Sequence, residues 1–355
     1  MGLHRRIGTL KFITIASMVL AILVAGCTAP QTTFDPSSDA TDKIHTLYIL
    51  VIVVSGLIGT AVLIALAYLL YRFRARPGVR AKQIHGNNTL EIIWTILPIL
   101  ALVMVGVPTV FAIAGAQRAP SEDALHINVI GHQWWFEVEY PGLGPDGESL
   151  MTANEIHVPI GREVAIHLTS NDVIHSFWVP RLVGKTDMVP NHPNDLEVFT
   201  PKEIGVFYGQ CAEFCGSAHA MMRFRVIVEP TAKFENWVEA LQTAPEPSDE
   251  GTFIASGQDV FMGNCSSCHK IYGTAAQGII GPDLTRFGSR LTLGAGILDN
   301  TSENAEAWIR NVRDLKPIPE GILGSGRPAM PTFNEVLSDA EIAAVSAYIR
   351  SQTVE

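Results

Sequence analysis

The sequence predicts a multi-domain membrane protein: a two-helix transmembrane hairpin, then a β-sandwich, then an all-α domain. Three observations carry this prediction. Residues 47–71 and 92–116 are stretches of 25 residues without a formal charge, each long enough to cross a hydrocarbon core of about 30 Å. Residues 125–230 alternate apolar and polar side chains as strands do. Residues 252–355 carry helix-periodic apolar faces after an acidic, proline-containing linker.

Composition agrees with this class. The chain of 355 residues has room for two compact domains besides its membrane segments, and its hydrophobic share of 47% is high for a soluble protein. The net charge of −10 argues against nucleic acid as a partner. All five cysteines fall into three short motifs, whose spacings fit ligation and cofactor attachment better than a disulfide framework.

The N-terminus has the pattern of a secretory leader. An apolar stretch at 12–25 follows the side chains His4, Arg5, Arg6 and Lys11. The run Leu23-Val24-Ala25-Gly26-Cys27 resembles a bacterial lipobox, in which the cysteine becomes the lipidated first residue of the mature chain. We therefore expect lipidation at Cys27. The alternative is an uncleaved apolar helix with an incidental cysteine.

Charge sets the orientation of the predicted hairpin. The connection between its two apolar stretches has no acid before Glu91 but carries Arg72, Arg74, Arg76, Arg80 and Lys82. The positive-inside rule places this loop in the cytoplasm, so everything after Gln117 faces outward. A buried helical hairpin in a soluble protein is the alternative.

The β region ends in a group of soft metal ligands. Alternation such as Phe224, Val226 and Val228 against polar neighbours favours an antiparallel β-sandwich or barrel. One loop before the last strand carries Cys211, Cys215, His219 and Met222, and His175 follows an earlier strand. Two thiolates, two imidazoles and a thioether favour copper over magnesium or calcium, and the second cysteine allows two thiolates to bridge two coppers. A structural zinc site, which prefers two-residue gaps between cysteines, and a Cys211–Cys215 disulfide are the alternatives.

The C-terminal region carries a haem motif. Cys265-Ser266-Ser267-Cys268-His269 is typical of covalent c-type haem attachment, with His269 placed to ligate the iron. The opposite ligand is expected to be Met330, in a proline-flanked loop, because Met262 is too close to the attachment site. A chance CxxCH in a helical domain is the alternative. Gly281-Pro282-Asp283-Leu284 resembles the cytochrome c segment whose proline carbonyl accepts a hydrogen bond from the axial imidazole.

Three helices are expected in addition to the hairpin. One has its apolar face at 234–241 and closes the β region. The second has an apolar face made of Ala305, Trp308, Ile309 and Val312. The last begins at a capping box formed by Ser338 and Glu341.

Four motifs carry a family resemblance: Gly131-His132-Gln133-Trp134-Trp135, Asp172-Val173-Ile174-His175-Ser176-Phe177, Gly184-Lys185-Thr186-Asp187 and Tyr208-Gly209-Gln210-Cys211-Ala212-Glu213-Phe214-Cys215-Gly216. Over residues 44–230 the chain resembles subunit II of haem–copper cytochrome c oxidases, and the fused cytochrome c domain resembles the caa type of bacteria. The resemblance implies a cupredoxin-like β-sandwich with a dinuclear CuA centre. The implied ligands are His175, Cys211, the carbonyl of Glu213, Cys215, His219 and Met222.

Three further roles follow from the resemblance alone. Trp134 matches the tryptophan through which electrons reach CuA, although a tryptophan on a strand also packs. The side chain of Glu213 would face a magnesium ion at the interface with subunit I. Glu91 matches a glutamate near a proton-uptake path; as an ordinary acid it would also suit the start of a helix.

The expected segments follow from these motifs. They are a lipoprotein signal peptide (1–26), a lipid-anchored linker (27–43), the transmembrane hairpin (44–117), the cupredoxin-like CuA domain (118–242), a linker (243–251) and the cytochrome c domain (252–355).

The resemblance implies a respiratory role at the bacterial cytoplasmic membrane, with both cofactor domains on its outer, periplasmic or extracellular, face. Electrons from a cytochrome c or a quinol-oxidising cytochrome bc complex would reach the haem c, then CuA, then a haem in catalytic subunit I, which reduces oxygen with proton pumping. This chain is then one subunit of the enzyme. The alternatives are the CuA-bearing small subunit of a nitric oxide reductase, and a membrane-anchored redox sensor or copper carrier.

Overall fold

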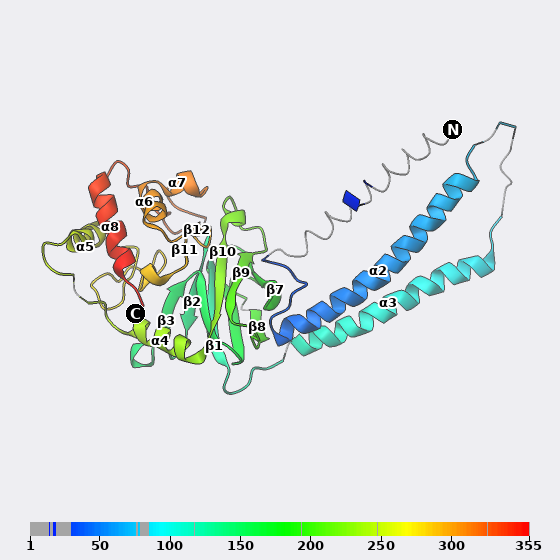
Figure 1. Cartoon of the computed structure of the whole chain (residues 1–355), viewed down its shortest axis with the longest axis horizontal. Coiled ribbons are helices and arrows are strands. Elements are labelled where there is room, and N and C mark those ends of the chain that lie inside the picture. The colour runs from blue at the N-terminus through cyan, green and yellow to red at the C-terminus, as the bar shows by residue number, and fades with distance from the viewer. Residues whose placement is uncertain are drawn as a thin grey trace. The chain divides into compact units, whose positions relative to one another are not determined.

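The computed structural model describes residues 14, 17–18, 30–75, 77–78, 85–116, 118–192, 194–246, 248–324 and 326–354. Cys27 and most of the predicted leader lie outside the described residues, as do Arg76, Arg80 and Lys82 of the basic loop. The chain divides into two compact units (Figure 1). One is Asp42–Arg118, and the other joins Met1–Thr41 to Ala119–Glu355.

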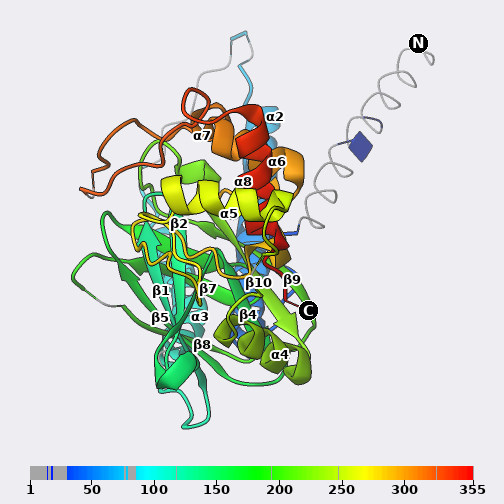
Figure 2. The same ribbon diagram turned by 90° about the vertical axis from the view of Figure 1, so that its left-hand side faces the viewer.

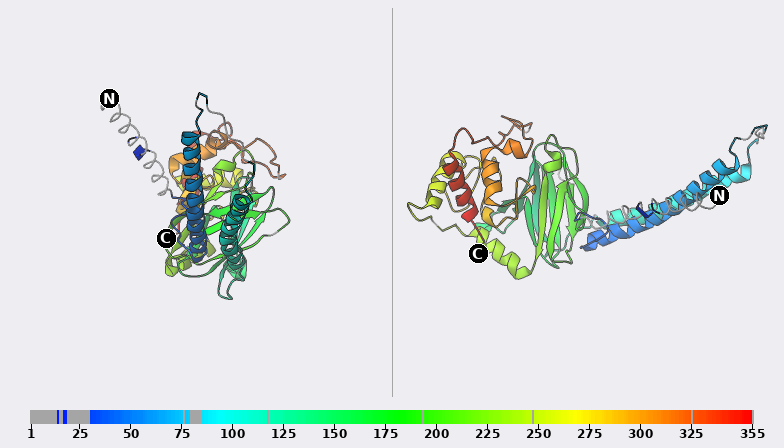
Figure 3. Two further views of the ribbon diagram at one scale, coloured as in Figure 1. Left: turned by 90° about the vertical axis from the view of Figure 1, so that its right-hand side faces the viewer. Right: turned by 45° about the horizontal axis from the view of Figure 1, so that its top comes forward.

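The first unit is a helical hairpin. Helices α2 (Asp39–Arg72) and α3 (Asn88–Ala116) lie side by side (Figures 1 and 3). Both are long and apolar enough to cross a membrane. Large apolar side chains such as Leu63 and Leu102 are exposed on them, as expected of a surface that faces lipid. The predicted hairpin is therefore confirmed.

The second unit contains a β-sandwich of two five-stranded sheets (Figure 2). The first sheet has the order β3 (Leu150–Ala153), β2 (Trp135–Tyr140), β1 (Leu125–His132), β5 (Val164–Ser170), β8 (Asn194–Phe199). The second has the order β4 (Glu155–Pro159), β10 (Arg223–Glu229), β9 (Gly205–Cys211), β6 (His175–Val179), β7 (Val183–Met188). Aromatic rings join the sheets across the core, because Phe224 of the second sheet contacts Phe136 of the first at a centroid distance of 4.8 Å. Phe224 also stacks on Phe177 of its own sheet at 4.7 Å.

The sheets are mixed and not wholly antiparallel as expected. Strands β1 and β5 run parallel, and so do β4 and β10. Alternation along a strand sets which side chains face the core, but it carries no information on the direction of the neighbouring strand. The expectation of an antiparallel sandwich was therefore wrong for these two pairs.

The described residues of the C-terminal domain form helices α5 (Phe253–Asn264), α6 (Ser302–Arg310), α7 (Val312–Leu315) and α8 (Asp339–Ser351). Its core contains Phe261, Ile342 and Tyr348, and α8 begins at the predicted capping box. The apolar face expected to run as far as Val312 is interrupted. Asn311 leaves the helical conformation, and its side chain accepts a hydrogen bond from Arg313 at the start of α7.

Hydrogen bonds join the C-terminal domain to the β-sandwich. Helix α4 (Thr231–Gln242) first closes the sandwich with Phe234, Trp237 and Leu241 buried, as predicted. An unpredicted hairpin, β11 (Thr292–Leu293) with β12 (Leu298–Asp299), then reaches back to the second sheet. Thr292 N donates to Glu155 Oε1 at 2.9 Å, and Arg223 N donates to the carbonyl of Ala295 at 2.9 Å.

A tight helix crossing generates the first testable prediction. A Cβ atom at Gly257 of α5 would lie 2.0 Å from the carbonyl oxygen of Ala344 on α8, whereas one at Gly263 would meet nothing within 4 Å. Gly257→Ala should destabilise the helical domain by about 1–3 kcal/mol through overpacking. Gly263→Ala should stabilise it by about 0.5–1 kcal/mol.

Urea unfolding of the detergent-solubilised full chain, followed by absorbance of its haem, measures both variants. An unfolding midpoint of Gly257→Ala equal to that of Gly263→Ala would contradict the close approach of α5 and α8.

Candidate metal and haem sites

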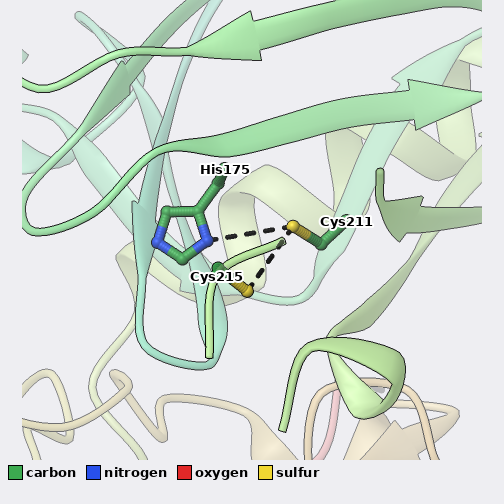
Figure 4. Close-up of side chains that lie close together, drawn as sticks. All are labelled: His175, Cys211 and Cys215. Atoms are coloured by element: carbon green, nitrogen blue, oxygen red, sulfur yellow. Dashed lines mark hydrogen bonds between the residues drawn. The ribbon is translucent and has the colours of Figure 1, made fainter. Parts of the chain in front are cut away.

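The thiol cluster forms where β6, β9 and β10 come together at one end of the second sheet. Cys211 is the last residue of β9, and His175 opens β6. The two strands pair with Phe177 opposite Cys211, so the sheet itself brings the histidine to the thiols (Figure 4). The loop from β9 to β10 supplies the other predicted side-chain ligands, Cys215, His219 and Met222.

One half of the cluster is centred on Cys211. Its Sγ lies 3.8 Å from His175 Nδ1 and 3.8 Å from Cys215 Sγ. The carbonyl oxygen of Glu213 lies 3.2 Å from the same sulfur. The two cysteines are free thiols, so the alternative of a disulfide is not what this structure contains.

The other half is centred on Cys215. Its Sγ lies 3.6 Å from His219 Nδ1 and 3.8 Å from Met222 Sδ. Each sulfur therefore has its own imidazole, and the carbonyl and the thioether lie on opposite halves. The fold brings all six predicted copper ligands together, and the thiols lie in the middle of the set.

A buried carboxylate orients His175. Asp172 Oδ1 lies 2.8 Å from His175 Nε2, which leaves Nδ1 facing Cys211, and Asp172 Oδ2 accepts from Gln133 N at 2.7 Å. Although burial opposes ionisation, these hydrogen bonds hold the pKa of Asp172 below its usual value. A Cβ at Gly131 would lie 2.6 Å from the His175 ring, so only glycine permits this packing.

The thiols require positive charge. The hydrogen bond between the two sulfurs lowers the pKa of Cys211, and the same bond, together with burial, raises the pKa of Cys215. One thiolate is thus favourable in the metal-free cluster, whereas a second beside it is not. Metal cations bound here would supply the charge that ionises both sulfurs, and the soft donor set fits copper.

Two side chains from the turn between β1 and β2 contact the thiol loop. Gln133 Nε2 donates to the carbonyl of Cys215 at 2.8 Å, and Trp134 Nε1 donates to the same oxygen at 3.0 Å. Trp134 is only 4% exposed. The indole therefore contacts the thiol loop directly, and it does more than fill the core of the β-sandwich.

The CxxCH motif follows helix α5. The amides of Cys268 and His269 donate to the carbonyl of Cys265 at 3.0 and 2.9 Å, which closes a tight turn. His269 Nδ1 lies 2.8 Å from the carbonyl of Pro282, so Nε2 is the free ring nitrogen. Burial lowers the pKa of His269 and keeps the ring neutral, as an iron ligand must be.

A large cavity contains all four predicted haem contacts. Its lining includes Cys265, Cys268, His269 and Met330 from the helical domain. The β-sandwich contributes His132, Gln133, Trp134 and Trp135 to the same lining. A Cβ at Gly281 would lie 2.6 Å from the His269 ring, which indicates how closely the chain surrounds the imidazole. Two thiols, a neutral imidazole and a thioether around one cavity fit a covalently bound haem.

Two residues that contact these sites, Asp172 and Lys316, were not predicted from the sequence. For Asp172 a signal was available, because an acid three residues before a ligand histidine can hydrogen-bond its ring. Lys316 gave no signal, because nothing nearby in the sequence marks it. Its Nζ donates to the carbonyl of Trp134 at 2.8 Å, and it lines the haem cavity.

Two other predicted residues are glutamates: Glu91 lies in the membrane hairpin, and Glu213 contacts the thiols through its backbone carbonyl. Glu91 stands in the first turn of α3, where its carboxylate accepts from Asn87 N at 3.4 Å, a contact typical of a helix start. Glu213 presents its carbonyl to Cys211, and the residue is half-buried.

Copper binding yields the second prediction. Met222 is fully buried beside Cys215, whereas the neighbouring Met221 is 37% exposed. Met222→Leu should remove a ligand and alter the copper absorption and paramagnetic resonance spectra, and Met221→Leu should leave them unchanged. Neither change should alter the haem spectrum. A parental copper spectrum in Met222→Leu would rule out the thioether as a ligand.

Haem ligation yields the third prediction. Met330→Ala should leave the haem covalently attached through Cys265 and Cys268 but make its iron high-spin, because the axial thioether is lost. Met262→Ala, at the methionine near the attachment site, should keep the low-spin spectrum. Optical and magnetic circular dichroism spectra test both variants, and a low-spin, methionine-type spectrum in Met330→Ala would assign the ligand elsewhere.

Comparisons with known proteins cover the membrane hairpin, the β-sandwich and the helical domain. Residues 27–112 match the family model for the transmembrane domain of cytochrome c oxidase subunit II, and residues 145–230 match the model for its periplasmic domain. Residues 254–353 match the cytochrome c model.

Whole-length relatives carry the same name. The chain is 36% identical to cytochrome c oxidase subunit 2 of Alkalihalophilus pseudofirmus over 94% of this chain and 95% of that protein. It is 33% identical to that of Bacillus sp. strain PS3 and 32% identical to that of Bacillus subtilis, each over 95% of this chain and 96% of the relative. With its membrane hairpin, cupredoxin-like β-sandwich and cytochrome c domain, the chain belongs to the cytochrome c oxidase subunit 2 family and is a subunit of an oxidoreductase complex.

Proposed function

We propose that this chain is the subunit of a respiratory cytochrome c oxidase that first receives electrons. It takes them onto a covalently bound haem c, transfers them to a dinuclear CuA centre and delivers them to the haem of catalytic subunit I, which reduces oxygen to water with proton pumping. One observation carries this proposal. Gln133 and Trp134 line the haem cavity and also donate hydrogen bonds to the carbonyl of Cys215.

The cytochrome c domain holds the haem. Cys265 and Cys268 would form the thioether bonds, and His269 and Met330 would ligate the iron. The haem supplies a one-electron carrier. The bond from His269 Nδ1 to the carbonyl of Pro282 fixes the plane of the imidazole and makes it a stronger donor.

The β-sandwich holds the copper pair. Its ligands are His175, Cys211, the carbonyl of Glu213, Cys215, His219 and Met222. The copper pair supplies a centre that shares one electron between two ions. Burial of both thiols, of His175 and of Met222 keeps water and exchange partners away, which favours a permanent centre over a copper carrier.

The Gln133–Trp134 peptide connects the haem cavity to the copper ligands. Trp134 lines the haem cavity, and its Nε1 donates to the Cys215 carbonyl. Fusion of the two domains in one chain makes their encounter intramolecular, with an effective concentration in the roughly millimolar range for a short linker. Electron transfer between the two sites therefore needs no diffusing protein.

The membrane hairpin anchors the subunit in the bacterial cytoplasmic membrane. Its two spans lie within residues 44–117, and lipidated Cys27 follows the signal peptide of residues 1–26. The cupredoxin-like domain (118–242) and the cytochrome c domain (252–355), joined by a linker at 243–251, lie on the outer face. Positive charge in the loop between the spans supports this orientation.

Partners complete the enzyme. The chain assembles with catalytic subunit I and other oxidase subunits, and a cytochrome c or a cytochrome bc complex donates electrons to it. The side chain of Glu213 faces a magnesium ion at the interface with subunit I. Glu91 stands near the start of a proton-uptake path.

Gas consumption by the membrane complex, purified through a tag on this chain, tests the function and is the fourth prediction. With a reductant and a mediator, we expect oxygen uptake that cyanide blocks. A complex carrying Cys215→Ser should lose this uptake, and the Met221→Leu complex should retain it.

The same experiment distinguishes an oxidase from the alternative functions. Nitric oxide consumption with negligible oxygen uptake would assign the chain to a nitric oxide reductase. Neither activity, with readily exchangeable copper, would favour a redox sensor or a copper carrier.

A further inference from the structure

Lys316 is a buried cation at the junction of the two cofactor domains. It follows helix α7 and is 3% exposed. Its Nζ donates to the carbonyl of Trp134 on the β-sandwich at 2.8 Å and to the carbonyl of Gly294 in the β11–β12 hairpin at 3.1 Å. The ammonium group of Lys316 thus joins the Trp134 peptide of the β-sandwich to the helical domain.

This arrangement is energetically costly. A buried ammonium without an ionised partner loses much of its hydration energy, and two carbonyl oxygens return only part of it. Among the residues that the structure describes, no carboxylate forms an ion pair with Lys316. Burial accordingly lowers the pKa of Lys316 to about 7. A neutral side chain of similar length would be cheaper to bury, so stability alone does not account for a lysine.

The two residues after Lys316 also contact the β-sandwich that carries the copper ligands. Ser217 Oγ, in the loop that carries Cys215, donates to the carbonyl of Pro317 at 2.8 Å. Ile318 packs against the core of the β-sandwich. Lys316 therefore sits in a segment held in place next to the thiol loop, and it also lines the haem cavity.

We propose that Lys316 is a positioning residue for electron transfer between the haem and CuA. This inference rests on the proposed function. Its two hydrogen bonds hold the Trp134 peptide at a fixed place between the centres, and its charge stabilises the added electron on both. In the step itself, the haem iron loses one electron and the copper pair gains it, with no bond made or broken.

The test uses the purified full chain with haem and copper bound, and a photoexcited ruthenium complex that reduces the haem. Lys316→Met removes the charge and the donors at nearly constant volume. Lys233→Met is the matched control, because the Lys233 side chain is 73% exposed on α4. The measured quantities are the rate at which the haem passes its electron to copper and the reduction potentials of both centres.

We expect Lys316→Met to slow the transfer beyond the variation between parent and control, because the Trp134 peptide loses the ammonium that joins it to Gly294. Both reduction potentials should fall, which a purely packing role would not cause. Lys233→Met should match the parent. A rate within about threefold of the parent and unchanged potentials in Lys316→Met would overturn the proposal, even if the protein became less stable.

A second variant keeps the proposal testable if Lys316→Met does not fold. Lys316→Gln keeps an N–H donor without the charge, so both potentials should fall as in Lys316→Met, and parental potentials would overturn the proposal. Failure of the proposed function is distinguishable, because the parent chain itself would then transfer no electron from haem to copper.

Discussion

The carbonyl oxygen of Cys215 is the point on which the two cofactor sites depend. It accepts hydrogen bonds from the side chains of Gln133 and Trp134, so both of its lone pairs are used by one turn between β1 and β2. Gly216 follows with a φ of +119°, a conformation that favours glycine, and a Cβ there would lie 3.0 Å from the Trp134 ring. The thiol loop and the indole therefore cannot move independently of each other.

Polar contacts hold the β11–β12 hairpin of the cytochrome c domain against the second sheet. Buried Glu155 accepts both the amide and the hydroxyl of Thr292, and Arg225 Nη2 donates to the carbonyl of Gly296 at 3.0 Å. A slipped orientation would leave such buried groups without partners, at a cost of about 1–3 kcal/mol for each neutral group. The interface consequently specifies one orientation, which a short-range electron transfer requires.

Residues close in sequence made much of both sites predictable. The ligands between Cys211 and Met222, and the CxxCH motif, lie within short loops, so spacing indicated them. The sequence also offered His175 as a ligand, but its distance from the thiols could not be predicted because it comes from another strand. The parallel strand pairs and the break at Asn311 were not predictable from side-chain periodicity. The contact of Lys316 with Trp134 spans 182 positions, and no local pattern encodes it.

We propose that the haem and the copper pair occupy fixed places on either side of the Gln133–Trp134 peptide. Pulsed electron paramagnetic resonance on the fully oxidised holoprotein measures the magnetic dipolar coupling between the ferric haem and CuA. We predict one narrow distance distribution that is the same in the isolated chain and in the assembled oxidase. A broad distribution, or a distance that changes on assembly, would show that the cytochrome c domain moves relative to the copper site and would contradict the claim.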